Sequence, residues 1–104
     1  MSERLLHAVL FTLKDKSQEK QQELVEACDK YLKPQAGVVF YSCGQRDLTL
    51  LRDVNDTAFE VALVILFESA EAQARYQEDP VHNQFIAEQE GNWENVRVFD
   101  SMDG

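Results

Sequence analysis

Two segments of the chain have apolar side chains on both faces of a predicted β-strand. In residues 5–13, alternate positions point to opposite faces, so His7 shares its face with large apolar residues, while the other face carries mainly alanine and leucine. Residues 59–67 end in seven consecutive apolar positions. Strands that are apolar on both faces are typically covered on both. We therefore predict that these two strands form the centre of a sheet.

Helical spacing of apolar residues predicts a helix over residues 18–33. Ser69 is the expected cap of a second helix over residues 70–78. Asp79 and Pro80 then restart the chain as a fresh helical turn, with Asp79 as the cap and Pro80 at the first helical position. Gly91 is expected to end this turn.

Two further strands are predicted over residues 37–45 and 96–100. Gly44 lies inside the first of them and indicates a bulge or a close backbone approach. The connection over residues 46–56 is longer than an ordinary hairpin loop and contains several apolar residues. We expect this connection to fold over either a cavity mouth or a partner subunit.

The predicted order of elements is β-α-β-β-α-β, which is the ferredoxin-like pattern. The fold class is therefore α+β: a four-stranded antiparallel sheet with helices on one face, in a single domain over residues 1–104. Two helices cover only one face of such a sheet, and the other face would remain apolar and exposed. We predict a homodimer through this sheet face, which would form a dimeric α/β barrel.

The composition limits the classes of partner. The chain has 104 residues, with 10 Lys and Arg against 19 Asp and Glu, and a formal net charge of −9. Neither nucleic acid nor an anionic membrane is an expected partner, because both require a basic patch. No run of 18 apolar residues and no signal-like basic start is present, which predicts a cytoplasmic protein. Cys28 and Cys43 do not form a CxxC pair and are expected to be buried, reduced thiols.

Tyr76 and His82 are the two neighbouring residues with acid–base chemistry. We predict that His82, in the first turn of a helix, is neutral, because the positive end of a helix disfavours imidazolium. A neutral imidazole accepts a proton near pH 7, and a phenol can donate one to a carbonyl oxygen. Tyr76 and His82 are therefore the predicted catalytic residues. His7, on a central strand, is the predicted substrate-binding residue.

Each of these residues also has a purely structural interpretation. Tyr76 and His82 would then hydrogen-bond to each other or to free backbone groups at the helix break, and His7 would be a satisfied core histidine. A metal held by His7 and His82 would require Asp79 to give up its capping role, so no metal site is predicted. No cofactor is expected.

The chain resembles the stress-responsive dimeric α/β-barrel family, often called Dabb. The resemblance covers nearly the whole chain and rests on five segments in the family's order. These are the opening His7–Phe11, the strand Gly37–Gly44, the strand end Leu66–Ser69, the pattern Tyr76-x-x-x-Pro80-x-His82 and the final Val98–Asp100. It implies a homodimeric ferredoxin-like fold with a cavity between the sheet and the helices of each subunit.

One plant branch, similar to olivetolic acid cyclase, closes linear polyketides by aldol condensation without a cofactor. There the residues that match Tyr76 and His82 are the working pair, and the one that matches His7 lines the pocket. The chain departs from that branch at Val61, where the branch has a further histidine. Haem-degrading monooxygenases share the dimeric barrel and use Asn, Trp and His, but the spacing of Asn92 and Trp93 does not fit them well.

The leading hypothesis is a cofactor-independent enzyme, cyclase-like or isomerase-like, that transfers protons on a small apolar carbonyl compound. The alternative is a non-catalytic homodimeric module that binds a small ligand or another partner. A haem-type or antibiotic-type monooxygenase is the third hypothesis.

Overall fold

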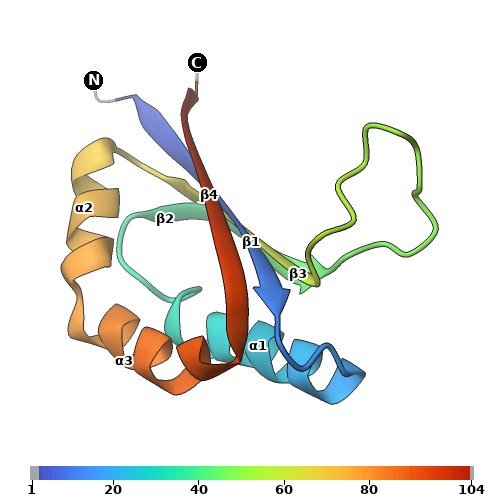
Figure 1. Cartoon of the computed structure of the whole chain (residues 1–104). Helices are drawn as coiled ribbons and strands as arrows, with labels where there is room; N and C mark the ends of the chain where they lie inside the picture. The colour runs from blue at the N-terminus through green and yellow to red at the C-terminus, as the bar shows by residue number, and fades with distance from the viewer. Residues whose placement is uncertain (1–2, 104) are drawn as a thin grey trace.

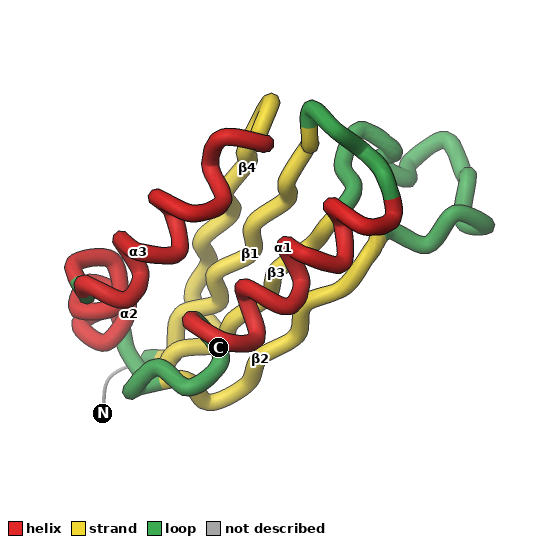
Figure 2. Tube along the Cα trace, turned by 90° about the horizontal axis from the view of Figure 1, so that it is seen from below, coloured by secondary structure: helices red, strands yellow, loops and turns green. Residues whose placement is uncertain are grey.

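The computed structural model describes residues 3–103 as a four-stranded sheet with three α-helices on one face (Figure 1). The strands are β1 (Arg4–Leu13), β2 (Val38–Gln45), β3 (Val61–Phe67) and β4 (Trp93–Asp103). The helices are α1 (Gln18–Tyr31), α2 (Ala70–Glu78) and α3 (Pro80–Gln89), followed by a 3₁₀ turn over Glu90–Asn92. Figure 2 shows the helices as one layer in front of the sheet. The predicted α+β ferredoxin-like fold is confirmed.

The two strands that are apolar on both faces lie at the centre of the sheet. The strand order is β2-β3-β1-β4, and all neighbours are antiparallel. Positions 7, 9, 11 and 13 of β1 are buried beneath the helices, and the positions between them are only partly covered. The same alternation runs along β3. The sequence pattern therefore predicted both the place of these strands and the exposed outer face of the sheet.

Side-chain caps begin the helices where the sequence predicts. The hydroxyl of Ser69 accepts a hydrogen bond from the backbone N–H of Ala72 at 3.1 Å and starts α2. The Asp79 carboxylate accepts from the N–H of Val81 at 2.8 Å, with Pro80 at the first position of α3. The predicted fresh turn is a ten-residue helix. The break at Asp79 turns the chain, and α3 continues next to α2 in the helical layer (Figures 1 and 2).

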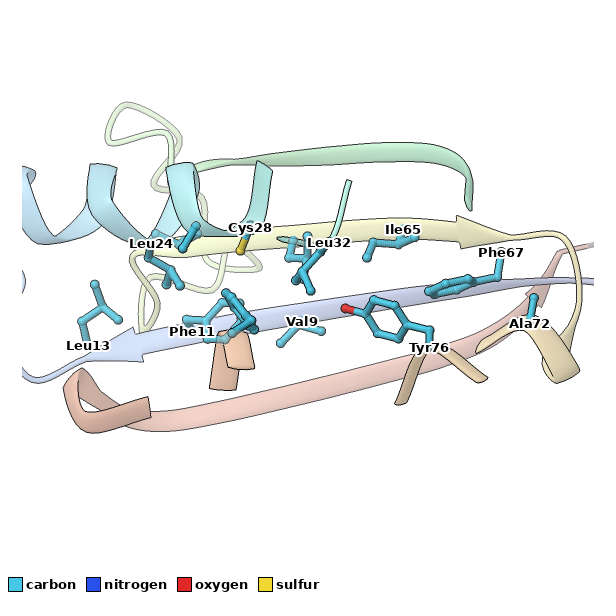
Figure 3. Close-up of a cluster of buried hydrophobic side chains, with 14 residues drawn as sticks. Val9, Phe11, Leu13, Leu24, Cys28, Leu32, Ile65, Phe67, Ala72 and Tyr76 are labelled. Atoms are coloured by element: carbon cyan, nitrogen blue, oxygen red, sulfur yellow. The ribbon is translucent and has the colours of Figure 1, made fainter. Parts of the chain in front are cut away.

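The core fills the space between the sheet and the helices (Figure 3). Its largest fully buried side chains are Phe67, Leu13, Leu24, Leu32, Leu63, Ile65, Val61 and Cys28. Cys28 is buried, Cys43 is half-buried, and both thiols are free. The adjacent Cys43 and burial raise the pKa of the Cys28 thiol, so that it stays protonated and behaves as a core residue.

Strand β4 is longer than the apolar pattern indicates. The sequence predicts residues 96–100, whereas the strand extends from Trp93 to Asp103. It pairs with nearly the whole of β1, from Leu13 opposite Trp93 to Arg4 opposite Asp103. The polar ends of β4 are held by backbone hydrogen bonds to β1, which leave no hydrophobic signal in the sequence.

The bulge expected at Gly44 lies elsewhere. Gly44 pairs in regular register with Ala62, and the register of β2 shifts between Val38 and Phe40. The prediction was wrong because a glycine inside a strand reports backbone freedom and not the pairing itself.

The connection between β2 and β3 does not cover the cavity described below. It runs from residue 46 to residue 60, and Figure 1 shows it reaching away from the three helices. None of the cavity-lining residues comes from residues 47–58 of this segment. Its exposed aliphatic side chains are Leu48, Leu50, Leu51 and Val54. The expected cover over a cavity mouth is not found at this cavity, and contact with a partner subunit stays a prediction.

None of the three described helices is both long and apolar enough to cross a lipid bilayer.

Gly37 is the glycine that this packing requires. Its φ is +87°, in the left-handed region, and a Cβ added there would lie 2.7 Å from the Cβ of Ala72 in α2. We expect Gly37→Ala to lower the free energy of unfolding by about 1–3 kcal/mol, because it adds backbone strain and displaces α2. Urea unfolding followed by circular dichroism measures this loss. Gly44→Ala is the matched control, since no atom lies within 4 Å of its added Cβ; equal midpoints for the two variants would contradict the prediction.

Candidate functional site

A cavity of about 410 Å³ lies between the sheet and helices α2 and α3. This volume is within the usual range for small-molecule sites. Its apolar walls are Val9, Phe11, Leu32, Leu63, Phe85, Ile86, Trp93, Val96 and Val98. Its polar lining consists of His7, Gln73, Tyr76, Gln77, His82 and Asp100. An apolar chamber with a few convergent polar groups is typical of a ligand or substrate site.

Tyr76 and His82 meet in this cavity from opposite sides of the helix break. Tyr76 extends from α2 beside Phe67 and toward Val9 (Figure 3). Its ring centroid is 4.5 Å from that of His82, with the ring planes at 57°. Both residues are buried, with 3% and 8% of their surface exposed. The structure therefore brings together the two residues that the sequence predicted as catalytic.

The contact between Tyr76 and His82 is a ring contact. Within residues 3–103 no hydrogen bond joins these two side chains, and the buried Nδ1 of His82 has no hydrogen-bond partner. A buried ring nitrogen without a partner is costly unless a ligand or water supplies one. His82 lines the cavity and also carries a buried ring nitrogen whose hydrogen-bonding capacity is unused.

His7 enters the same cavity from β1 and is held by a carboxylate from β4. Its Nδ1 lies 2.5 Å from Oδ1 of Asp100, which is the residue directly opposite on the neighbouring strand. An ionised carboxylate only accepts hydrogen bonds, so Nδ1 of His7 is the donor. In a neutral imidazole this leaves the lone pair on Nε2. His7 is 4% exposed, and its ring centroid is 6.0 Å from that of Tyr76.

Burial sets the protonation of Tyr76 and His82. Desolvation, with a smaller effect of Cys28, raises the pKa of the Tyr76 phenol, so Tyr76 is a hydrogen-bond donor at neutral pH. Desolvation also lowers the pKa of His82; His7 adds to this effect and Asp79 opposes it. The sequence predicts a neutral His82 from its place at a helix start, and the structure adds burial as a further cause that lowers its pKa.

The lowered pKa of His82 has a consequence for stability. Below the unfolded-state pKa of about 6.5, the unfolded chain binds a proton at this residue that the folded chain resists. We therefore expect stability to fall as the pH drops from about 6.5 toward the lower folded-state pKa. His82→Gln should reduce the loss of melting temperature between pH 7.5 and pH 5.5, as measured by scanning calorimetry. An equal loss in both proteins would contradict this assignment.

The donors for a metal site are not brought together. Asp79 keeps its capping hydrogen bond, and no group of three or more His, Cys, Asp or Glu side chains in residues 3–103 is placed to hold a metal ion. Asn92 is bound to the backbone of Asp15 through both ends of its amide. Trp93, by contrast, lines the cavity and packs against Phe11 at 4.9 Å between ring centroids.

Asp100 is the main site residue that the sequence reasoning missed. Its signal was present, because Val96, Val98 and Asp100 share one parity of a strand, and a carboxylate among inward-facing apolar positions is unusual. Its partner could not be read from the sequence, since the register of β4 against β1 decides that Asp100 faces His7.

Comparisons with known proteins agree with the fold. The family model of the stress responsive A/B barrel domain, Dabb, matches residues 5–103. A dimeric ferredoxin-like protein of unknown function from Thermobifida fusca has a TM-score of 0.81 at 18% identity, covering 99% of this chain and 93% of its own. A Dabb family protein from Mesorhizobium loti has a TM-score of 0.80 at 21% identity and covers 99% of both chains.

A protein with a named activity is also among the similar structures. Hydroxynitrile lyase from Passiflora edulis has a TM-score of 0.79 at 18% identity, covering 100% of this chain and 96% of its own. At this identity the likeness concerns the fold. No curated protein matches the chain in sequence.

Proposed function

The chain belongs to the stress responsive A/B barrel domain family, and we propose that its cavity catalyses proton transfer next to the carbonyl group of a small apolar compound, without a cofactor. The observation that carries this proposal is the meeting of Tyr76, His82 and the His7–Asp100 pair in one apolar cavity of about 410 Å³. A neutral base and neutral donors in a largely apolar site suit the formation of an enolate.

The His7–Asp100 pair is the better base. Asp100 holds the tautomer that leaves the lone pair on Nε2, and its charge stabilises the imidazolium that forms. The pKa of His82, by contrast, is lowered by burial and by His7. The sequence hypothesis made His82 the base and His7 the group that orients the substrate; the geometry favours an exchange of these two roles.

Tyr76 and His82 then act as hydrogen-bond donors to the carbonyl oxygen of the substrate. As His7 takes the proton from the α-carbon, the electron pair of the C–H bond becomes the C=C bond of the enolate, and the π pair of the carbonyl group moves onto its oxygen. The Tyr76 hydroxyl donates a hydrogen bond to this oxygen, and so does the ring N–H of neutral His82. Donors placed where negative charge develops contribute most in a site of low dielectric constant.

Deuterium exchange tests this reaction without knowledge of the natural substrate. The wild-type protein in D₂O is expected to accelerate deuterium incorporation at the carbons next to the carbonyl of 4-phenylbutan-2-one, measured by proton NMR. The variant with both Tyr76→Phe and His82→Phe should lose this acceleration. A wild-type rate equal to that of buffer alone would reject the enzymatic proposal for this class.

A binding measurement and a second substrate separate the alternatives. Saturable binding of the ketone without exchange would favour the non-catalytic ligand-binding module. Cleavage of mandelonitrile to benzaldehyde and hydrogen cyanide, followed by the absorbance of benzaldehyde, would point to the reaction type named for the Passiflora edulis neighbour.

The uncovered sheet face is the proposed homodimer interface. Its central positions are Leu6, Ala8, Leu10, Ala62, Val64 and Leu66, which pair in register on the face away from the helices. Phe40 and Phe99 continue this face onto the edge strands and are 55% and 54% exposed in the single chain. A second copy of the chain is the proposed occupant, since structural neighbours from Thermobifida fusca and Jannaschia are described as dimeric.

A charge on this face should separate the subunits. Wild-type protein is expected to have twice the 12.0 kDa mass of one chain in light scattering, and Phe40→Glu should give single chains at micromolar concentration. The reason is the cost of burying an unpaired carboxylate between apolar sheets. Val81→Glu adds the same charge on α3, in the helical layer, and should remain dimeric. Dissociation of both variants, or of neither, would contradict the sheet-face interface.

A further inference from the structure

The charges around the cavity are unevenly distributed. Asp100 is the only Asp, Glu, Lys or Arg among the described residues that line it. The arginines on the surrounding elements are already paired with carboxylates: Arg4 with Asp103 at 2.9 Å, Arg75 with Glu68 at 4.0 Å and Arg97 with Asp56 at 2.6 Å. An anionic ligand would therefore meet a fixed carboxylate and no cation to balance its own charge.

We propose that the cavity selects uncharged carbonyl and amide compounds over carboxylates and phosphates of the same shape, and that Asp100 is the residue that rejects anions. This inference names the substrate class of the proposed site and so rests on the proposed function. It assigns to Asp100 a specificity role in addition to its contact with His7.

Three physical effects act in the same direction. An anion that enters an apolar chamber gives up hydration that the walls do not replace. Its charge is repelled by the carboxylate of Asp100, which lies at the cavity wall 2.5 Å from the ring of His7. The chain as a whole carries a formal charge of −9, which lowers the local concentration of anions around the protein.

The enolate of the proposed reaction does not meet the same barrier. Its negative charge appears on the substrate only as His7 gains the proton, so the sum of charges in the cavity does not change. A ligand that arrives as a carboxylate brings a charge without a matching proton. The site can therefore stabilise an anion that it makes and still exclude one that comes from solution.

A matched set of probes tests this selectivity by direct binding. The set comprises 3-phenylpropanamide, 3-phenylpropanoate and 3-phenylpropylammonium, which share a ring and a three-carbon chain and differ in charge. Trp93 is the single tryptophan of the chain and lines the cavity, so its fluorescence reports occupancy. We expect the amide to bind at least about tenfold more tightly than the carboxylate at pH 7, a ratio that corresponds to about 1.4 kcal/mol.

Asp100→Asn separates the repulsion by Asp100 from general desolvation. In this variant the carboxylate should bind about tenfold more tightly than in wild type, the ammonium compound should bind more weakly, and the amide should change less than twofold. Desolvation alone would leave both charged probes unaffected by the substitution. Asp103→Asn is the matched control: it removes the same charge from the same strand, but its partner is Arg4 and it does not line the cavity.

Each outcome decides the proposal. Equal or tighter binding of the carboxylate by wild type overturns it, and so does failure of the amide to bind at millimolar concentration. An equal effect of Asp100→Asn and Asp103→Asn overturns the assignment to Asp100. These titrations need no turnover, so selective binding without deuterium exchange would reject the proposed reaction and keep the selectivity. Deuterium exchange without charge selectivity in binding would keep the proposed reaction and reject the proposed selectivity.

Discussion

His7→Phe is expected to lower the rate of protein-catalysed deuterium exchange on 4-phenylbutan-2-one by at least about a hundredfold. Removal of a positioned general base typically costs 10²–10⁴ in rate. Phenylalanine retains the ring that packs edge-on against Phe67 and Tyr76, so the cavity should keep its shape. The exchange rate at saturating ketone, measured by proton NMR, checks this prediction.

Two further variants identify which imidazole is the base. Asp100→Asn keeps His7 but removes the carboxylate that fixes its tautomer, so we expect an intermediate loss of about tenfold to a hundredfold. His82→Phe removes one donor to the oxygen and should also give an intermediate loss. If His82→Phe abolishes exchange while His7→Phe retains it, His82 is the base, as the sequence hypothesis had it.

Phe67→Ala is expected to lower the free energy of unfolding by about 3–5 kcal/mol, the usual loss for a fully buried phenylalanine. Phe67 has 0% of its surface exposed and lies at the end of β3 against Tyr76, with ring centroids 4.9 Å apart. A hole at this position removes the wall on which the Tyr76 ring rests. Urea unfolding measures the stability loss. The rate of deuterium exchange on 4-phenylbutan-2-one under native conditions is also expected to fall, because the Tyr76 hydroxyl loses its fixed position.

The matched control for this variant is Leu51→Ala in the connection between β2 and β3. Leu51 is 67% exposed, so truncation removes little buried surface and should change stability by less than about 0.5 kcal/mol. Similar losses for the two variants would show that the buried ring of Phe67 does not stabilise the fold as described.

Much of the architecture could be predicted from local sequence patterns. The apolar runs of β1 and β3 predicted their central place, because a strand covered on both faces has few polar positions. Ser69, Asp79 and Pro80 predicted the helix starts, because capping depends on side chains within three residues of the backbone groups that they satisfy. The full length of β4 was not predictable in this way, since the pairing of its polar ends with β1 depends on a strand about ninety residues earlier in the chain.

The same distinction between local sequence patterns and long-range contacts applies to the candidate site. The sequence by itself determined that Tyr76 and His82 flank a helix break and that His7 lies on a central strand, because these are properties of residues close together in the chain. Only the tertiary structure decided that all three face one cavity and that Asp100 lies 2.5 Å from His7. It also decided that the connection after β2 leaves this cavity uncovered. Register between distant strands and the packing of helices on the sheet set these contacts, and a single sequence does not specify either through its local periodicity.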